Sequence, residues 1–389
     1  MSLNSVNFFK NRTSTMNDID FIKIVYIASR SLNNIGGIEN YMKNLCPRMV
    51  KNNYKVVLYV QGDKYSKSNY YGVTVISMPS VKNKFFNKIF IAAQGTFHSL
   101  ITNRNVDIYH YNAIPSAAFS FLPILLGKNV VYQGHGFEWQ RGKWSSKMKK
   151  LISVLERFVI AINKNFTMVS DDQSEYIKKF GKNSVTITPG VDVIDKEYDT
   201  QYVHKYELMK KNYVFFLGRL VPEKSPDVLI KAFNKLEKAD LKLVISGDDP
   251  NEKEYIKYLK RLARNNTDIV FTGAVYGDEK KALMQHCKLF CIPSELEGLP
   301  ITLLEAMSQK KICLASDIPA NKEALNDTGV FFGLNNVDDL SRKILDIVDY
   351  PEKYERLGGL AKVRIEQKFT WDRIADQFDD YYHTILNNA

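Results

Sequence analysis

The feature that most constrains the fold is a series of short apolar runs separated by segments with helical spacing. Runs of about four to eight residues rich in Val, Ile, Tyr and Phe are typical of strands buried on both faces. Strands that alternate with helices predict a parallel sheet covered by helices on both faces. In the first half of the chain we predict strands at 21–28, 55–60, 73–77, 107–110, 129–133, 166–169 and 185–188.

The same pattern starts again at Tyr213, and this restart predicts a second α/β domain. Its strands are expected at 213–217, 242–246, 269–272, 289–293 and 312–315, and its helices at 226–237, 252–264, 278–285 and 300–308. A chain of 389 residues exceeds what one core usually supports, at about 150 residues per domain. We therefore predict a flexible tail at 1–19, a first domain at 20–191, a linker at 192–212, a second domain at 213–370 and a final helix at 371–389. Met16 is an alternative start.

The composition predicts a globular cytoplasmic protein, with 45% hydrophobic and 25% charged residues. The longest apolar run, 119–127, is about half the length of the roughly 18 residues that span a bilayer. The polar start lacks the apolar segment of a secretory signal. Because the four cysteines are scattered through apolar sequence, we expect reduced core thiols at Cys46, Cys287, Cys291 and Cys313.

The basic excess of the chain lies in its first half. Residues 1–185 hold 25 Lys and Arg against 10 Asp and Glu, whereas residues 186–389 hold 29 against 33. Basic residues at 141–150 lead into apolar residues with helical spacing at 151–162, which resembles an interfacial helix. A second stretch, 82–90, mixes lysines with phenylalanines. We predict binding to an anionic membrane surface and no nucleic-acid partner; an ordinary amphipathic helix is the alternative.

A loop and helix near residue 300 have the character of an anion site. Residues 295–307 read Glu-Leu-Glu-Gly-Leu-Pro-Ile-Thr-Leu-Leu-Glu-Ala-Met. Proline favours the first helical position, so we expect a helix from Pro300 whose free N–H groups near 299–302 bind phosphate. Glu297 on the loop and Glu305 on the helix would flank this phosphate site, which suits a nucleotide sugar. The alternative is a capped core helix with solvated glutamates.

Two cations follow the first strand of the second domain. Arg219 and Lys224 lie just beyond the run 213–217. In open α/β sheets ligands bind beyond the carboxyl ends of the strands, so both side chains are expected to face a cleft between the domains. Together they could neutralise a departing diphosphate.

Four motifs in this order resemble the retaining GT-B glycosyltransferases of family 4. They are the loop Gly36-Gly37-Ile38-Glu39, the pair His135-Gly136, Gly218-Arg219 with Lys224, and Glu297 with Glu305 eight residues later. The resemblance spans about 21–385. It implies an α/β fold of two Rossmann-like domains that face a cleft, with the acceptor on the first domain, the donor on the second, and a C-terminal helix that crosses back to the first.

The resemblance also implies roles for individual residues. By resemblance, Glu297 contacts the donor-sugar hydroxyls and Glu305 contacts the ribose. Arg219 and Lys224 correspond to the family's cationic clamp, and His135 corresponds to its sugar-proximal histidine. The candidate catalytic residues are therefore Arg219, Lys224, Glu297 and His135. The candidate donor-binding residues are Gly36, Gly37, Gly218, Ala274, Val275, Gly298, Leu299, Pro300, Ile301 and Glu305, with the nucleobase expected near Ala274 and Val275.

The family reaction retains the anomeric configuration and needs no metal and no cofactor besides the nucleotide sugar, here a UDP, GDP or dTDP derivative. Segment 135–144 looks like that of bacterial enzymes that build capsule or O-antigen, rhamnosyltransferase-like enzymes included. A lipid-linked oligosaccharide or lipopolysaccharide acceptor at the cytoplasmic face of the inner membrane is thus expected. Trp139 and Trp144 could stack on sugars or anchor the loop.

Some positions depart from the family pattern. Gly247-Asp248-Asp249-Pro250 stands where many relatives have a Gly-rich turn, and Pro47 is expected to kink the first helix or remove a hydrogen bond. Two other functions stay open. One is a non-catalytic GT-B scaffold at the membrane, and the other is a nucleotide-sugar epimerase, which would need a second acid/base group beside His135.

Overall fold

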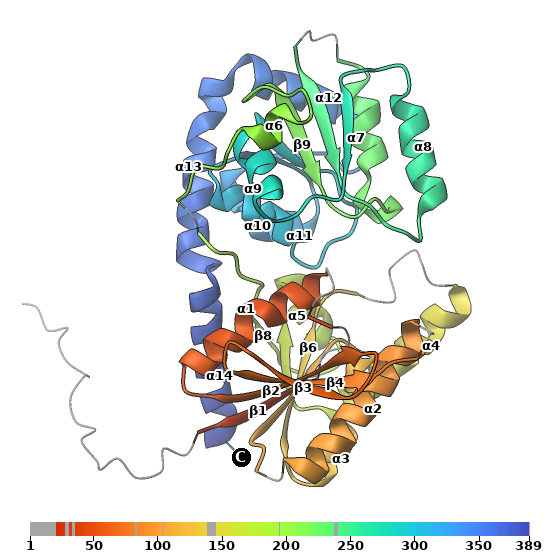
Figure 1. Ribbon diagram of the computed structural model, residues 1–389, viewed down its shortest axis with the longest axis vertical. Coiled ribbons are helices and arrows are strands. Elements are labelled where there is room, and N and C mark those ends of the chain that lie inside the picture. Colours follow the sequence, from red (N-terminus) through yellow and green to blue (C-terminus); the bar gives the residue numbers. More distant parts are fainter. Residues whose placement is uncertain are drawn as a thin grey trace, which may run out of the picture.

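The computed structural model describes residues 21–27, 31–32, 36–81, 84–103, 105–137, 145–193, 195–236 and 240–388. These form two α/β domains stacked one above the other, with α13 (Pro351–Lys368) and α14 (Trp371–Asn387) along one side (Figure 1). The predicted fold class is thereby confirmed: two parallel-sheet domains and a C-terminal helix that returns to the first domain.

The first domain contains an eight-stranded sheet in the order β3-β4-β2-β1-β5-β6-β7-β8. All pairings are parallel except the β3–β4 hairpin. The strands are β1 (Lys23–Ile27), β2 (Lys55–Gly62), β3 (Ser66–Tyr70), β4 (Val73–Pro79), β5 (Ile108–Asn112), β6 (Asn129–Gly134), β7 (Asn165–Met168) and β8 (Val185–Thr186). Strand β3 was not predicted, because it is a largely exposed edge strand of polar residues without an apolar run.

Helices cover both faces of this sheet, as predicted. They are α1 (Gly37–Lys51), α2 (Lys84–Thr102), α3 (Phe121–Leu125), α4 (Ser146–Ile162) and α5 (Asp171–Lys178), with a short 3₁₀ helix η1 (Ser116–Phe119). One core cluster joins α1 and α14 to the sheet, and a second joins α2 and α4 to it. Helix α1 includes Pro47 and ends only at Lys51, so the proline costs the helix one N–H donor without ending it.

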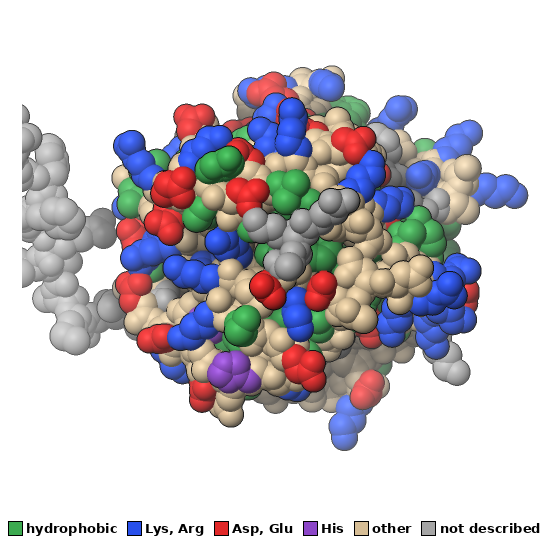
Figure 2. Space-filling model, turned by 90° about the horizontal axis from the view of Figure 1, so that it is seen from above, with side chains coloured by type: hydrophobic (Ala, Val, Ile, Leu, Met, Phe, Trp, Pro, Cys, Tyr) green, Lys and Arg blue, Asp and Glu red, His purple; other side chains and the backbone are tan. Residues whose placement is uncertain are grey.

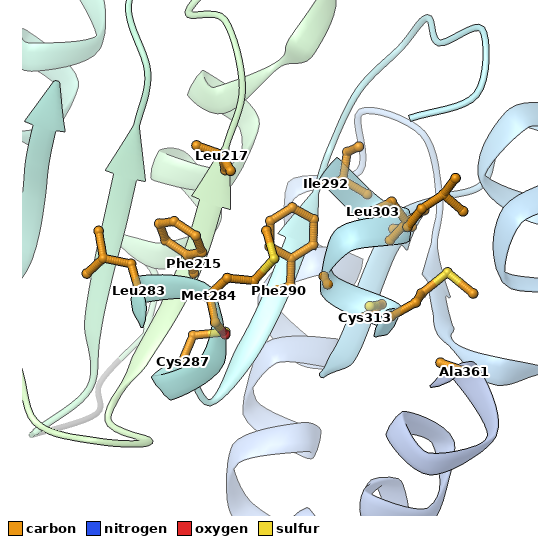
Figure 3. Packing of buried hydrophobic residues seen from close by; sticks show 14 of the residues in the cluster. Phe215, Leu217, Leu283, Met284, Cys287, Phe290, Ile292, Leu303, Cys313 and Ala361 are labelled. Atoms are coloured by element: carbon orange, nitrogen blue, oxygen red, sulfur yellow. The ribbon is translucent and has the colours of Figure 1, made fainter. Parts of the chain in front are cut away.

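The second domain has a six-stranded parallel sheet in the order β11-β10-β9-β12-β13-β14. The strands are β9 (Tyr213–Leu217), β10 (Lys242–Ser246), β11 (Ile269–Gly273), β12 (Leu289–Ile292), β13 (Ile312–Ser316) and β14 (Val330–Phe332). The helices are α6 (Gln201–His204), α7 (Pro226–Phe233), α8 (Lys253–Ala263), α9 (Gly277–His286), α10 (Ile301–Ser308), α11 (Pro319–Leu325), α12 (Val337–Asp349) and α13. Phe215, Phe290 and Leu303 pack between sheet and helices (Figure 3), and Figure 2 shows acidic and basic side chains interspersed over one face of the molecule.

Two details of the second domain differ from expectation. Pro300 is the N-cap of α10 rather than its first residue, and its carbonyl oxygen accepts hydrogen bonds from Leu303 N (3.1 Å) and Leu304 N (3.2 Å). The segment expected as a linker contains α6, whose Val203 is buried in the same core cluster as Phe215. Its polar composition conceals this short buried helix.

Helix α14 completes the core of the first domain. The hydroxyl of Tyr382 lies 3.0 Å from the hydroxyl of Tyr26 and 2.7 Å from Nδ1 of His110, and Nε2 of His110 lies 2.9 Å from Oε1 of Gln133. Burial lowers the pKa of His110 to about 3, so the imidazole is neutral at physiological pH. A polar network thus holds the returning helix to the sheet.

Helix α4 has apolar residues on two faces. Ile152 and Val159 are buried in the core, whereas Leu151 (47%), Val154 (58%) and Phe158 (43%) are exposed. An ordinary amphipathic helix would present polar residues on its outer face, so the exposed stripe needs a different explanation. Within the described ranges, no helix is long and apolar enough to cross a membrane.

Candidate active site between the domains

The candidate residues of the second domain lie where β9 and β12 end. Gly218 to Lys224 follow β9, and residues 293–300 follow β12, its neighbour in the sheet. A backbone hydrogen bond from Glu295 N to Glu223 O (3.0 Å) joins these two loops. The carboxyl edge of the sheet therefore brings the predicted cations and Glu297 together.

Gly298 places this loop against the first domain. A Cβ atom built on Gly298 would lie 3.3 Å from the carbonyl oxygen of His135 and 3.5 Å from a methyl of Val169. A side chain here would press on the backbone of the first domain, which would have to shift slightly. His135, predicted from the first domain, is thus adjacent to the Glu297 loop.

Lys224 and Glu297 form the most buried ion pair among the candidate residues. Nζ of Lys224 lies 2.5 Å from Oε2 of Glu297, and the two side chains are only 18% and 9% exposed. The hydroxyl of Ser294 donates to the other carboxylate oxygen at 2.7 Å. Both oxygens of Glu297 are therefore oriented by neighbours before any ligand binds.

Arg219 is also paired with acidic side chains. Its guanidinium lies 3.0 Å from Oε1 of Glu223 and 3.4 Å from Oδ2 of Asp249. Burial would raise the pKa of Asp249, but hydrogen bonds from Asn251 and the charge of Arg219 bring it below its ordinary value. Asp249 belongs to the turn that departs from the family pattern, so this departure supplies a partner for Arg219.

The turn after β10 also explains why Gly247 follows the strand. Its φ is +145°, and a side chain there would overlap the carbonyl oxygen of Gly218. The amide of Gly218 in turn donates to Ser246 O at 3.1 Å. Gly218 is thus held by close backbone packing, and this packing sets the direction in which Arg219 leaves β9.

Glu305 is paired with a lysine that sequence reasoning missed. Nζ of Lys280, in the first turns of α9, lies 2.7 Å from Oε1 of Glu305 on α10. The side chains are 25% and 22% exposed, so the pair is accessible to a ligand while being partly desolvated. No sequence motif marks Lys280, since one lysine in a polar helix start is common.

His135 is oriented by residues of the first domain. Its Nε2 lies 2.9 Å from Oδ1 of Asn112 at the end of β5, and its ring meets that of Tyr41 edge-on at 5.2 Å. The amide of Gly136, where φ is +123°, donates to Oε1 of Gln173 at 2.9 Å. The histidine is thus held at the carboxyl edge of the first sheet, which faces the second domain.

The glycine loop lies at the start of α1. Gly36 is the N-cap of this helix in extended conformation, and Gly37 is its first residue. A side chain at Gly36 would overlap the carboxylate of Glu39, which folds back over it. The edge-on contact of Tyr41 with His135 shows that the start of α1 is near the histidine.

Several candidate donor-binding residues can offer only their backbone. The side chains of Val275 and Leu299 are buried in the core of the second domain with Leu303. Ala274, just beyond β11, is exposed. Trp139 and Trp144 lie outside the described residues. Among the described residues, no group of three or more His, Cys, Asp and Glu is arranged as metal ligands.

A second contact between the domains involves Glu323 of α11. Its Oε2 accepts a hydrogen bond from Asp171 N at the start of α5, at 2.9 Å. The pKa of Glu323 is raised to about 7, mainly by burial and further by the charges of Asp171 and Asp172. The hydrogen bond from Asp171 N and the charge of Arg364 oppose this rise. The charge at this contact therefore changes near neutral pH.

Comparisons with known proteins agree with this architecture. Residues 35–194 match the family model Glycosyltransferase Family 4, and residues 200–364 match Glycosyl transferases group 1. An uncharacterised glycosyltransferase of Methanocaldococcus jannaschii is 25% identical over 87% of this chain and 92% of its own length. An O-antigen chain mannosyltransferase of Escherichia coli is 27% identical over 62% of this chain and 67% of its own.

A third relative is the Campylobacter jejuni N,N'-diacetylbacillosaminyl-diphospho-undecaprenol α-1,3-N-acetylgalactosaminyltransferase. It is 24% identical over 77% of this chain and 83% of its own. Among solved structures, sucrose-phosphate synthase of Thermosynechococcus elongatus superimposes with a TM-score of 0.81 at 16% identity, over 95% of this chain and all of that one. The structure of Anabaena HepE with UDP-glucose superimposes with a TM-score of 0.76 at 15% identity, over 93% of this chain and all of that one. The two family matches, these relatives and the shared architecture identify the chain as a family 4-like glycosyltransferase with the GT-B fold.

Proposed function

We propose that this glycosyltransferase moves a sugar from a nucleoside diphosphate donor to a lipid-linked glycan acceptor in bacterial surface-polysaccharide synthesis, with retained configuration and without a metal ion. The observation that carries the proposal is the convergence of Lys224, Glu297, Lys280 and Glu305 at the carboxyl edge of one sheet, beside His135 of the other. The names of the O-antigen and undecaprenol-linked relatives support a lipid-linked acceptor.

In the proposed reaction the bond between the anomeric carbon and the β-phosphate oxygen breaks, and the diphosphate leaves with the electron pair. An acceptor hydroxyl forms the new bond on the same face of the sugar, and its proton passes to the departing phosphate oxygen. Lys224 and Arg219 would stabilise the charge that develops on the diphosphate, because cations placed before the reaction need no reorganisation. The N–H groups at the start of α10 add to this effect.

His135 and Glu297 would act on the sugar. The contact between Gly298 and the His135 carbonyl brings their loops together at the domain boundary. Glu297, already oriented by Lys224 and Ser294, would accept hydrogen bonds from sugar hydroxyls. Because the Glu297 carboxylate is already fixed, it loses little freedom when the sugar binds. It can therefore hold the anomeric carbon in line with the hydroxyl of the acceptor substrate. The sugar itself, a rhamnosyl group or another hexosyl group, stays a prediction.

The test is incubation of the full chain with UDP-, GDP- and dTDP-sugars and a bacterial membrane extract. We expect release of one nucleoside diphosphate and label in the lipid fraction, with anomeric configuration of the product determined by NMR. Glu297→Gln should reduce turnover by at least about a hundredfold. Lys257→Met, which removes an exposed ion pair on α8, should leave turnover unchanged. A chain that binds nucleotide but turns over no donor would be a scaffold, and epimerised donor without acceptor would indicate an epimerase.

We further propose that the outer face of α2, α3 and α4 binds an anionic membrane. Phe90, Phe97 and Ile101 are exposed along α2, as are Leu125 and Leu126 at the end of α3. Ring contacts between Phe97 and Phe119 (6.3 Å) and between Phe121 and Phe158 (6.4 Å) connect these helices to α4. All three helices lie on one side of the first domain (Figure 1).

Basic residues accompany this apolar surface on α4, at Lys147, Lys149, Lys150 and Arg157. Lysine and arginine attract anionic headgroups while exposed aromatic and aliphatic side chains enter the interface. Sedimentation with phosphatidylglycerol vesicles should decrease as salt rises, because the electrostatic part is screened. Val154→Asp should weaken sedimentation at every salt concentration. Val363→Asp, at an exposed valine of α13, should leave sedimentation unchanged, and equal loss in both variants would contradict the assignment.

A further inference from the structure

The pair Lys280–Glu305 connects two helices that follow different strands of the second sheet. Helix α9 follows β11 at one edge of the sheet, and α10 follows β12 near its centre. Lys280 lies in the first turns of α9, so its side chain starts from the carboxyl edge, where ligands bind in such sheets. Its 2.7 Å contact with Glu305 joins α9 to α10, and both side chains keep about a quarter of their surface exposed, so a ligand at this edge can reach the pair.

The contact occupies one carboxylate oxygen and leaves the other available. Lys280 bonds Oε1 of Glu305, and the structure gives Oε2 no partner among the described residues. A carboxylate accepts hydrogen bonds only, with lone pairs to spare on both oxygens. The ammonium limits rotation of the carboxylate, so the remaining acceptor positions are fixed in direction. A vicinal diol, which supplies two O–H donors side by side, matches such a fixed pair of acceptors.

We propose that Lys280 is a positioning residue that fixes the Glu305 carboxylate for the cis-diol of a ribonucleoside diphosphate, and so makes the donor site select ribonucleotides over 2′-deoxyribonucleotides. This inference rests on the proposed function and narrows its donor class to UDP- or GDP-type sugars. A deoxyribose offers one hydroxyl where the site has acceptors for two. A partly buried acceptor left without its donor weakens binding, which is how such sites reject an analogue that lacks a hydroxyl.

The charge of Lys280 has a second effect on the same ligand. Glu305 would otherwise place an unpaired, partly desolvated negative charge near a diphosphate that is itself anionic. The ammonium neutralises the carboxylate, so the ribose contact does not oppose phosphate binding. Lys280→Met removes both the fixed orientation of the Glu305 carboxylate and the neutralisation of its charge. Lys280→Arg keeps the charge and at least one donor, and is expected to restore both effects in part.

The experiment is calorimetric titration of the full chain with UDP, 2′-deoxy-UDP, GDP and 2′-deoxy-GDP. For the base that binds, the wild-type protein should favour the ribonucleotide by at least about tenfold. In Lys280→Met this preference should fall below about threefold and overall affinity should decrease, whereas Lys280→Arg should recover most of the preference. With the donor sugar, Lys280→Met should raise KM more than it lowers kcat, since the ribose is remote from the reacting bond.

The control is Lys257→Met, which removes an exposed lysine of the same domain. It should change neither affinity nor preference, and an equal effect in this variant would overturn the inference. If wild-type protein binds ribonucleotides tightly and Lys280→Met keeps the full preference, the inference is wrong while the proposed function stands. If wild-type protein binds no nucleoside diphosphate, the proposed function fails and the inference with it.

Discussion

The ion pair between Lys224 and Glu297 should couple the stability of the second domain to its chemistry. Exposed pairs contribute about 0.2–1 kcal/mol, whereas breaking a fully buried pair costs about 3–5 kcal/mol because a charge is left uncompensated. With side chains 18% and 9% exposed and a distance of 2.5 Å, this pair lies between these limits. We expect Lys224→Met and Glu297→Gln each to lower the free energy of unfolding by about 2 kcal/mol.

The double variant separates the pair from its surroundings. Because it removes both charges together, we expect a total loss of about 2 kcal/mol rather than about 4, which is a coupling energy of about 2 kcal/mol. Urea unfolding followed by circular dichroism measures the stabilities. Turnover should fall at least about a hundredfold in all three variants, since each of them lacks at least one of the two charges that act on the donor.

The matched control is the exposed pair Lys257–Glu254 on α8, whose removal should cost less than about 0.5 kcal/mol. Strict additivity of the two single losses would show that the charges do not stabilise each other in solution. Unchanged stability in Lys224→Met would refute the reasoning from burial altogether.

Three further predictions follow from other contacts. Tyr382→Phe should lower the free energy of unfolding in urea by about 1–3 kcal/mol, because the buried Nδ1 of His110 loses its partner. Glu323→Gln should be more stable than the wild-type protein above pH 7 by about 1–2 kcal/mol, after allowance for partial exposure. This difference in stability should shrink below pH 7, because the protonated Glu323 carboxyl, which the folded state favours, forms there and resembles the amide of Gln. A difference in melting temperature that stays constant with pH would contradict the prediction. Gly298→Val should lower kcat at least about tenfold by pushing its loop from His135, with stability changed by less than about 1 kcal/mol.

Much of the fold could be predicted from periodicity. Strands β9 and β10 were predicted to the residue, because parallel strands buried on both faces are continuous apolar runs with sharp ends. Strand β3 could not be predicted, since its residues are polar and exposed and form a strand only by antiparallel pairing with β4. The buried Val203 escaped notice for a similar reason: a single apolar side chain in a polar segment gives no period.

The candidate site was predictable only where a motif names its residues. The sequence indicated Lys224 and Glu297 separately, and the adjacency of their loops follows from the order of β9 and β12 in the sheet. Neither Lys280 nor Asp249 could be recognised, because each acquires its role from a partner on another element. Roles of that kind depend on helix placement, which spacing along one helix does not determine.

The return of α14 to the first domain reverses the usual order of completion during synthesis. Its buried residues, among them Ile374, Phe378 and Tyr382, belong to the first domain's core, yet they follow the whole second domain along the chain. The core clusters of the second domain contain no residue beyond Phe369. Domains commonly mature from the N-terminus during translation. Here the whole core of the second domain is synthesised before α14, so the sheet face that α1 and α14 cover in the first domain is completed only after the second domain.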